Sequence, residues 1–547
     1  DAAMTLAKRH YQRLWFPEPG TGGDIASRAE HALTKEQFDA LMPNEFWREV
    51  VDRVAQEAPD TLLLAEAFWL MEGYFVRTLG MHRVYNSAFM NMLRDEKNAE
   101  YRLVIKNTLE FDPRILERYV NFMNNPDERT AVDQFGKDDK YIGICTMLAT
   151  MPGLPMFGHG QIEGFTEKYG MEYRRAYRDE QPDGYLISRH EREIFPLLRR
   201  RHLFAQAGEF LLYDFQPAGG PVNEDVYAYS NRVGQERALV VYHNRYAEAR
   251  GYVHTSAAYS VPTEQGEGRA LVQQSLGRGL ALHDEEGAFA VFRDHVSGLE
   301  YIRSSRELCR DGLYVELGAY KVHVFLDWRE VWDDEKHLYR DIAARLQGRG
   351  VPSIDEALQD MLLAPIHEPF RELVNADMFG RIIEARVRGA ADEPDQKLLD
   401  QVERLSTRLL GAVTQMAHGT GDQVAGALAV RQGLEAILRL PVAKSLLPLL
   451  ASEEYAWASQ QIEKGMEDPA AWGLLLGWLF TSALGRVIGD ADPATTSRAL
   501  FDQWRLSRIL ADALRGQGLD DDLIRQLVGA VRILASYRQW FRLADAG

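Results

Sequence analysis

Three carboxylic acids stand at positions where the strands of one sheet could bring them together. Glu66 directly follows an apolar run at residues 61–65, Asp127 follows a short extended run at residues 119–123, and Asp1 opens the chain. An apolar run of this length is typical of a strand buried in a parallel sheet. In (β/α) barrels the chemistry lies at the carboxyl ends of such strands. Since glycosidases place two carboxylates around the bond they cleave, these residues predict glycoside chemistry.

The segments around the three acids resemble the motifs of the α-amylase family, glycoside hydrolase family 13. Residues 1–3 match the tail of the Arg-x-Asp-Ala-Ala motif that ends the fourth barrel strand. Residues 65–68, Ala-Glu-Ala-Phe, fit the acid/base motif after strand five. Residues 122–127 are similar to the Phe-x-Asn-Asn-His-Asp pattern after strand seven. The resemblance covers roughly residues 1–330.

The resemblance implies a role for each residue of a candidate site. It implies Asp1 as the nucleophile, Glu66 as the general acid and base, and Asp127 as the residue that holds sugar hydroxyls near the transition state. It also suggests three substrate-contacting residues: Trp69, Tyr85 and Asn125. The two aromatic side chains would stack on sugar rings, although aromatic residues equally often serve as packing residues. No metal ligand is assigned.

Each acid also has a purely structural interpretation. Asp1 could be an ordinary exposed terminal residue, and Glu66 could be a surface acid at the start of a helix. Asp127 could be an acid in a first helical turn, where it complements the helix dipole. That last interpretation requires Asn125 to cap a helix that has Pro126 at its first position, as the sequence predicts.

Two departures from the family pattern bear on the reaction. Residues 4–5 are Met-Thr where the family often has Lys-His, and Pro126 replaces the family's His. The Pro-Asp pair and residues 65–68 are similar to the maltosyltransferase branch, which moves maltose from its phosphate onto glucan. We therefore expect a retaining glycoside hydrolase or transglycosylase acting on α-linked glucans or maltooligosaccharides. The alternatives are a maltosyltransferase-like enzyme that uses a sugar phosphate, or a non-catalytic glucan- or protein-binding module.

The order of predicted elements divides the chain into three domains. Residues 1–206 alternate helix and strand, which predicts an α/β domain, and the resemblance implies strands five to eight of a (β/α)8 barrel. Residues 207–328 contain short β-branched and aromatic runs between turns, which predict a β-sandwich with a long loop at 263–287. Residues 329–547 show helical periodicity and predict an all-α domain. One interpretation of that domain is a contact with a second copy of the chain or with another protein.

Local signals give further expectations. Thr34 and Gln37 form a capping-box pattern, and Ser188 with Glu191 forms another. Pro394 is expected to open a helix with an apolar face at 398–413.

Composition limits the partners and the compartment. The chain has 547 residues and a formal net charge of -18, which disfavours nucleic acid as a partner. Its two cysteines, Cys145 and Cys309, are far apart in the sequence and suggest a reducing cytoplasm. The longest apolar stretch, residues 471–484, is shorter than the length typical of a membrane span and predicts a buried helix, so no membrane contact is expected.

The start of the chain matters for the family interpretation. If the resemblance holds, barrel strands one to four lie upstream of Asp1. The family's calcium ligands lie largely in that half, so we assign no cofactor, and this part of the chain does not indicate calcium. Half a barrel would leave strand edges unpaired, so we expect the 547-residue chain alone to be inactive and sticky.

Overall fold

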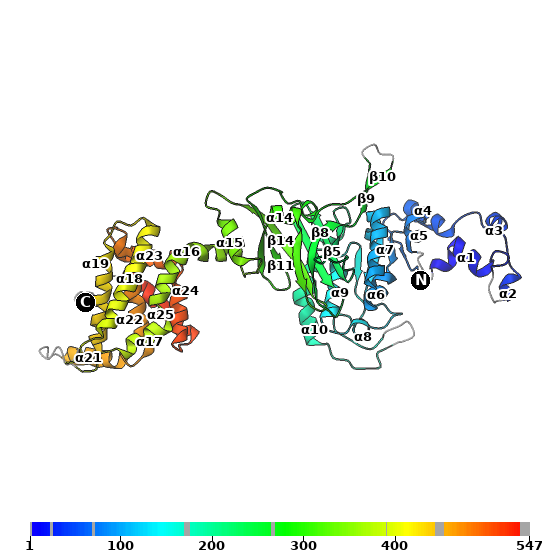
Figure 1. Cartoon of the computed structure of the whole chain (residues 1–547). Helices are drawn as coiled ribbons and strands as arrows, with labels where there is room; N and C mark the ends of the chain where they lie inside the picture. Colours follow the sequence, from blue (N-terminus) through cyan, green and yellow to red (C-terminus); the bar gives the residue numbers. More distant parts are fainter. Residues whose placement is uncertain are drawn as a thin grey trace. The chain divides into compact units, whose positions relative to one another are not determined.

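The chain folds into two compact units, residues 1–355 and residues 356–547 (Figure 1). The computed structural model describes residues 3–21, 26–67, 72–168, 175–263, 268–389, 391–442 and 453–536. The predicted boundary between residues 206 and 207 stays a prediction, because the α/β part and the β-rich part lie in the same compact unit.

A four-stranded parallel sheet organises the first part of the first unit. Its strands follow one another in sequence order: β1 (Leu64–Ala65), β2 (Arg83–Tyr85), β3 (Tyr119–Phe122) and β4 (Leu154–Met156). The helices preceding and connecting them include α1 (Lys8–Trp15), α2 (Ala26–Ala29), α3 (Lys35–Leu41), α4 (Phe46–Glu57), α5 (Glu72–Arg77), α6 (Ser87–Arg94), α7 (Asn98–Phe111), α8 (Ala131–Phe135) and α9 (Asp139–Thr150). The predicted alternation of helix and strand around a parallel sheet is thus confirmed.

The first strand is shorter than the sequence predicts. The apolar run at residues 61–65 contributes only Leu64–Ala65 to β1. β1 lies at the end of the strand order, so it pairs only with β2 within this sheet. Leu62 and Leu64 are exposed in consequence. An apolar run predicts burial on both faces, but an edge position in the sheet decides otherwise.

Two predicted helix starts are wrong, and one is confirmed. Thr34 caps α3 in a capping box with Gln37, as predicted. Asn125 caps only a turn, whereas the next helix, α8, begins at Ala131 after the cap residue Thr130. Ser188 lies inside α10 (Gly184–Arg189), whose cap is Asp183. A short polar side chain can accept a hydrogen bond from a backbone amide equally well in a turn or at the start of a helix. The sequence pattern alone therefore does not distinguish a turn from a helix start.

Helix α9 joins the parallel sheet to the β-rich part. Its residues from Tyr141 to Thr150 are all buried, and they share one hydrophobic core with strands of both sheets. Gly143 faces the buried ring of Tyr242, and a Cβ atom on this glycine would lie less than 3.0 Å from three ring atoms. The absence of a side chain at residue 143 is therefore what lets the helix pack closely on the second sheet.

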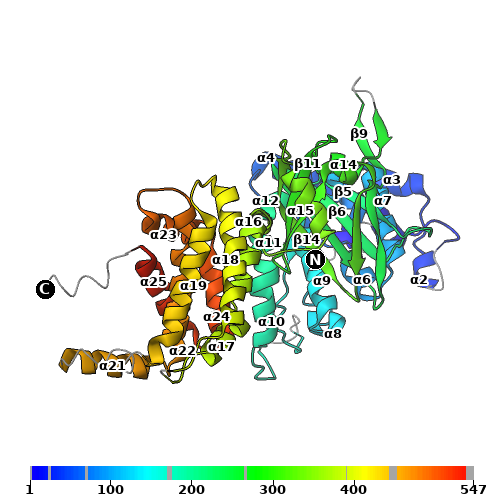
Figure 2. The same cartoon turned by 60° about the vertical axis from the view of Figure 1, so that its left-hand side comes forward.

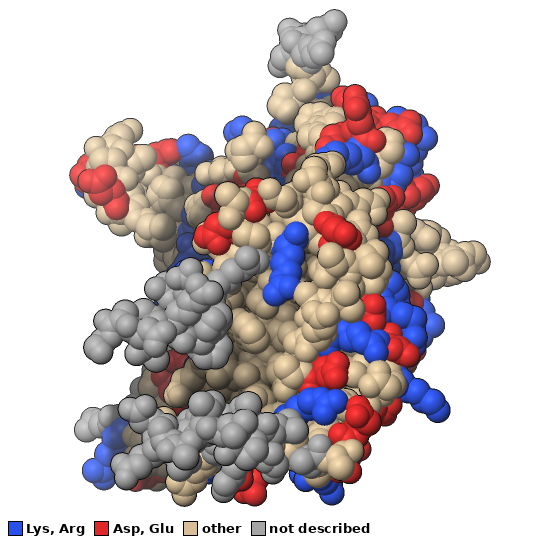
Figure 3. Space-filling view, turned by 90° about the vertical axis from the view of Figure 1, so that its left-hand side faces the viewer, with Lys and Arg blue, Asp and Glu red and all other residues tan. Residues whose placement is uncertain are grey.

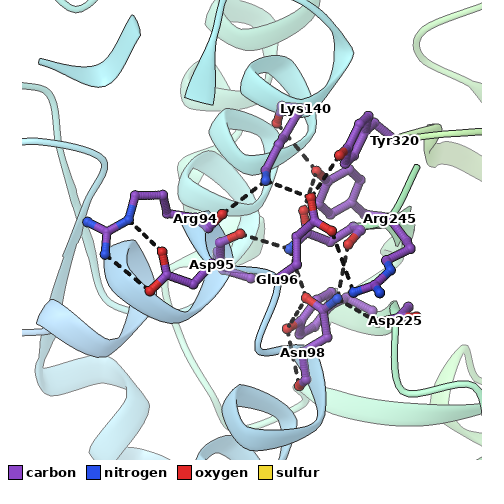
Figure 4. Close-up of polar contacts among 12 residues, drawn as sticks. Arg94, Asp95, Glu96, Asn98, Lys140, Asp225, Arg245 and Tyr320 are labelled. Atoms are coloured by element: carbon purple, nitrogen blue, oxygen red, sulfur yellow. Dashed lines mark hydrogen bonds and ion pairs between the residues drawn. The ribbon is translucent and has the colours of Figure 1, made fainter. Parts of the chain in front are cut away.

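A polar junction holds the same two parts together (Figure 4). Glu96 lies in the turn between α6 and α7 with a left-handed backbone (φ 54°). Its Oε1 accepts hydrogen bonds from Lys140 Nζ on α9 (2.8 Å) and from the Tyr320 hydroxyl (2.7 Å). Beside it, Asn98 Nδ2 donates to Asp225 Oδ1 at 2.7 Å. Hydrogen bonds to charged partners of this kind fix the orientation of the α6–α7 turn.

The β-rich part forms one continuous eight-stranded antiparallel sheet with the order β12-β11-β14-β7-β6-β5-β8-β13. Its strands are β5 (Leu211–Gln216), β6 (Val226–Val233), β7 (Glu236–His243), β8 (Ala249–Ser256), β11 (Ala288–Asp294), β12 (Glu300–Ser304), β13 (Leu313–Leu317) and β14 (Val322–Trp332). The predicted sandwich is therefore a single curled sheet. Irregular register in β5 and β11 accompanies the curl, as bulges increase local twist.

The two faces of this sheet contact different cores. In β7, Leu239 and Val241 join the cluster inside the curl, whereas Val240 and Tyr242 join the cluster shared with α9. This alternation follows from the two-residue period of a strand. The predicted loop at 263–287 is wrong in part, because it contains β10 (Arg269–Val272), which pairs with β9 (Tyr259–Pro262), and helix α13 (Leu276–Gly279).

The second unit is helical, as predicted. Its main helices are α16 (Ile354–Leu373), α17 (Ala376–Glu384), α18 (Gln396–Ala417), α19 (Gln423–Arg439), α21 (Glu453–Gly465), α22 (Pro469–Ser482), α23 (Pro493–Gln503), α24 (Leu506–Gly516) and α25 (Asp521–Ser536). Helices α18 and α19 run side by side (Figure 2). The predicted apolar face of α18 is buried, but its cap is Asp395 and not Pro394.

The apolar stretch of the second unit packs inside it. By length and composition alone, the segment Pro469–Val487 could cross a membrane. However, 67% of its apolar stretch is buried within the protein. Leu476, Phe480 and Leu484 belong to the core of the unit.

In Figure 3, acidic and basic side chains are interspersed with uncharged areas.

Candidate functional site

Glu66 and Tyr85 lie side by side at the carboxyl edge of the parallel sheet. The register pairs Ala65, the last residue of β1, with Val84, so Glu66, directly after β1, stands level with Tyr85, the last residue of β2. Both side chains are half-buried. Burial raises the pKa of the Tyr85 hydroxyl, and the negative charge of Glu66 raises this pKa further. An acid and a phenol thus share one partly desolvated environment.

The ring of Tyr85 is held by packing as well. It meets the ring of Phe122, in β3, edge to face with centroids 5.8 Å apart. Phe122 is buried in the core of the first unit. The ring of Tyr85 therefore has a packing role, which is the structural interpretation that the sequence left open for this aromatic residue. The hydroxyl is the polar part of the side chain, on which the charge of Glu66 acts.

Buried carboxamides tie the ends of the neighbouring strands together. Asn86, just after β2, donates from Nδ2 to Asn121 Oδ1 in β3 at 2.8 Å. Asn121 in turn donates from Nδ2 to the carbonyl of Pro152, just before β4, at 3.3 Å. Both side chains are buried, so each hydrogen bond matters for the register of the strand ends.

Asn124 is a buried polar residue with an unused acceptor. Its side chain is 5% exposed, and its Oδ1 has no hydrogen-bond partner in the described part of the chain. The side chain of Asn124 packs closely against Gly158, which follows β4. Only glycine allows this close packing, because a Cβ atom at residue 158 would lie less than 3.0 Å from three atoms of the Asn124 side chain. The amide of Gly158 donates to Gln161 Oε1 at 3.1 Å, which fixes the loop. Leaving a buried acceptor unpaired costs about 1–3 kcal/mol, so a hydroxyl donor would be favoured here.

Asn125 and Asp127 form a turn beyond β3. Asn125 Oδ1 accepts from the backbone amides of Asp127 (3.0 Å) and Glu128 (2.9 Å). The side chain of Asp127 is exposed, and its carbonyl accepts from Lys168 Nζ at 2.7 Å. Asp127 is thus outside a helix, so the helix-dipole interpretation of this acid is wrong.

The structure brings the predicted residues together in two pairs. Glu66 lies with Tyr85 at the end of β1 and β2, and Asn125 lies with Asp127 beyond β3. Because β2 separates β1 from β3, the two strand ends are roughly 10 Å apart, at about 4.8 Å per strand. Asp1 and Trp69 lie outside the described residues, so their roles stay predictions.

Sequence reasoning missed the buried carboxamides of this edge. Asn86, Asn121 and Asn124 each end or interrupt an apolar run, and Gln161 lies in the Gly-rich segment after β4. A polar residue inside a run that is otherwise buried was the available signal, since such a residue requires a partner. Within the described ranges, there is no group of three or more His, Cys, Asp or Glu residues placed to hold a metal ion.

Comparisons with known proteins give a distant structural likeness. No protein-family model matches the sequence, and no curated protein matches it. Among solved structures, the α-amylase of Geobacillus thermoleovorans in complex with acarbose is similar with a TM-score of 0.36 and 14% identity, over 52% of this chain and 57% of that one. The debranching enzyme of Nostoc punctiforme, soaked with acarbose, gives a TM-score of 0.34 and 15% identity, over 51% and 54%.

A third similar structure is the Anoxybacillus α-amylase, with a TM-score of 0.34 and 15% identity, over 55% of this chain and 57% of that one. The chain therefore spans little more than half the length of these enzymes. About half of this chain thus resembles α-amylase-family enzymes distantly in structure.

Proposed function

We propose that the first unit carries part of the active site of a retaining enzyme that cleaves or transfers α-linked glucans, with Glu66 as its general acid and base. The observation that carries the proposal is the position of Glu66: half-buried, directly after a parallel strand, and beside Tyr85. The carboxyl ends of parallel strands are where catalytic groups of (β/α) folds lie. The motif resemblance supports the same assignment.

The proposed reaction begins with protonation of the leaving glycosidic oxygen by Glu66. A second carboxylate, which we assign to Asp1, attacks the anomeric carbon and forms a glycosyl-enzyme ester as the leaving group departs with the proton. Glu66 then removes a proton from the incoming water or sugar hydroxyl, which displaces Asp1. Hydrolysis and transfer differ only in that acceptor. The negative charge of Glu66 acts on the half-buried hydroxyl of Tyr85, so we propose that this hydroxyl lies at the same end of the site.

Sugar hydroxyls would be recognised by the polar groups farther along the same edge. For Asn124 to take part, the segment around Gly158 must move, because the unpaired Oδ1 of Asn124 is buried from solvent. In our proposal Asp127 clamps hydroxyls from the turn beyond β3. This requires the exposed carboxylate of Asp127 to turn toward a bound sugar.

The exposure of Asp127 also favours a second candidate, a non-catalytic module that binds glucan or protein. In that case Glu66 would be retained at the sheet edge without an aligned partner acid. A maltosyltransferase-like reaction, in which phosphate takes part, is the other alternative and rests on the sequence of residues 65–68 and on the Pro-Asp pair.

The test is incubation with maltoheptaose, with and without inorganic phosphate. Both the 547-residue chain and a protein extended upstream of Asp1 are used. Shorter products alone indicate hydrolysis, longer products formed together with shorter ones indicate transfer, and a sugar phosphate indicates the phosphate-dependent reaction. The variant Glu66→Gln should lower the rate of formation of each product by about 10² or more, whereas Glu100→Gln, which changes an exposed acid on α7, should not. Binding without any product from the extended protein would favour the non-catalytic module.

A further inference from the structure

A concave surface lies on the antiparallel sheet, away from the carboxyl edge of the parallel sheet. One cleft of about 660 Å³ opens between α14 (Ser305–Arg310), α15 (Leu338–Leu346) and the strand β12. An adjoining cleft of about 520 Å³ shares Arg303, Glu307 and Tyr314 with it. We name the two together the tyrosine cleft. Their volumes are in the range of small-molecule sites.

Two tyrosines present aromatic surface to solvent in this cleft. Tyr252 on β8 and Tyr314 on β13 are direct cross-strand partners, and their ring centroids are 5.2 Å apart with an angle of 58° between the planes. They are 40% and 44% exposed. The Tyr314 hydroxyl donates to Glu316 Oε1 at 3.0 Å, which restrains the ring. The pair thus presents exposed aromatic surface to the cleft, with its two rings inclined to each other, and tyrosine rings can stack on the apolar faces of other ring systems.

The charges that line the tyrosine cleft are balanced. Three arginines and three acids line it: Arg303, Arg306, Arg340, Glu286, Glu307 and Asp311. Glu286 forms ion pairs with Arg340 (3.4 Å) and with Arg306 (3.5 Å). A balanced set gives no strong field for a polyanion or a metal ion. It does offer planar donors and acceptors in pairs, which suit the neighbouring hydroxyls of a neutral sugar.

Arg303 is held in place by the backbone. Its two terminal nitrogens donate to the carbonyl of Ile302 (2.8 Å) and to the carbonyl of Gly348 (2.9 Å), which follows α15. The guanidinium plane is therefore fixed before any ligand arrives, and Arg303 lines both parts of the cleft. Preorganised polar groups of this kind lower the entropy cost of binding.

We propose that the tyrosine cleft is a second binding site, which takes a neutral oligosaccharide with a sugar ring against Tyr252 and Tyr314 and hydroxyl groups against Arg303 and Glu307. The choice of an α-glucan among neutral sugars rests on the proposed function, whereas the site itself rests on the cleft. A site of this kind holds a glucan chain on the enzyme away from the reacting bond.

The test is titration of the full chain with maltoheptaose by calorimetry. Tyr314→Ala should weaken binding about tenfold or more, the effect of removing about 1.4 kcal/mol of contact. Tyr314→Phe retains the ring and should bind within about twofold of the unchanged chain on the same scale. The matched control is Tyr246→Ala, which removes an 82% exposed tyrosine that pairs with Tyr320 outside the cleft. Circular dichroism checks that each variant is folded.

Hydrogen-exchange mass spectrometry then locates the ligand. Protection by maltoheptaose at residues 302–314 and 338–348 supports the proposal. Binding that is unaffected by Tyr314→Ala, or protection confined to the carboxyl edge of the parallel sheet, would overturn it.

The outcome is separable from that of the proposed function. Tyr314-dependent binding without any product from the extended protein would remove the proposed reaction and keep the cleft. Product formation together with binding that does not depend on Tyr314 would keep the proposed reaction and remove the tyrosine cleft as a binding site. Glu66→Gln should leave binding at the tyrosine cleft unchanged.

Discussion

Replacing Gly143 by alanine tests whether helix α9 is what joins the two sheets of the first unit. A methyl group at this position would lie less than 3.0 Å from three atoms of the Tyr242 ring, where ordinary contact begins at 3.4 Å. The ring is fully buried, and its hydroxyl donates to the carbonyl of Lys140 (3.3 Å) and to Asn244 Oδ1 (3.1 Å). The ring therefore cannot retreat without breaking these contacts.

The expected cost follows from three opposing effects. Overpacking of a core costs about 1–3 kcal/mol, and disturbing a buried hydrogen bond costs about 1 kcal/mol more. Alanine gains about 1 kcal/mol over glycine inside a helix. The free energy of unfolding of the first unit should thus fall by about 1–3 kcal/mol.

Urea denaturation followed by fluorescence and circular dichroism measures this change. Gly184→Ala is the matched control, because a Cβ atom there meets nothing within 4 Å. The unfolding of the helical unit, residues 356–547, serves as an internal reference. If Gly143→Ala is as stable as Gly184→Ala, the close packing of α9 on the second sheet is refuted.

Three further predictions concern charge and protonation. Glu66→Gln should lower turnover of maltoheptaose by about 10² or more, the usual scale of general acid catalysis, and an unchanged rate would remove Glu66 from the mechanism. Burial opposes ionisation of Glu96, but the hydrogen bonds from Lys140 and Tyr320 outweigh it and lower the pKa of this carboxyl group. Stability from Glu96 is therefore present above its unfolded pKa and lost as the pH falls through the folded value; denaturation at pH 7 and pH 3 should show this loss, and Glu96→Gln should make it smaller. Burial lowers the pKa of the His190 imidazole to about 4, so the folded state favours the neutral ring. The stability that His190 contributes should therefore be lost as the pH falls from 6.5 toward 4, and NMR titration of the imidazole and denaturation over that range would detect this loss.

Several elements of the fold could be predicted from the sequence because their patterns are local. Residues 207–328 were predicted to be β-rich, and β13 (Leu313–Leu317) within them shows the local pattern, since its side chains alternate strictly between buried and exposed. The apolar face of α18 was predicted from helical spacing in the same way. In contrast, β8 (Ala249–Ser256) contains Gly251, which weakens a strand locally, and its pairing with β5 and β13 holds it in the sheet.

The candidate site was predicted only in part, for a similar reason. Glu66 was singled out because an apolar run leads into it; the structure places it directly after β1, level with the end of β2, and its catalytic role stays a prediction. Asn86 and Asn121 were missed because asparagine at the end of a run is also typical of a turn. Only the neighbouring strands show that these carboxamides are buried and bonded to each other.

The sequence by itself determined the order of the three kinds of structure, the strand that carries Glu66, and the motif likeness that suggests glycoside chemistry. These depend on residues close together in the chain, whose periodicity fixes which face is apolar. Only the tertiary structure decided that the β-rich strands form one curled sheet, that Asp127 sits in an exposed turn, and that Tyr252 and Tyr314 meet in one cleft. Such features depend on strand register between distant segments, and a shift of one residue would reverse the face on which each side chain lies.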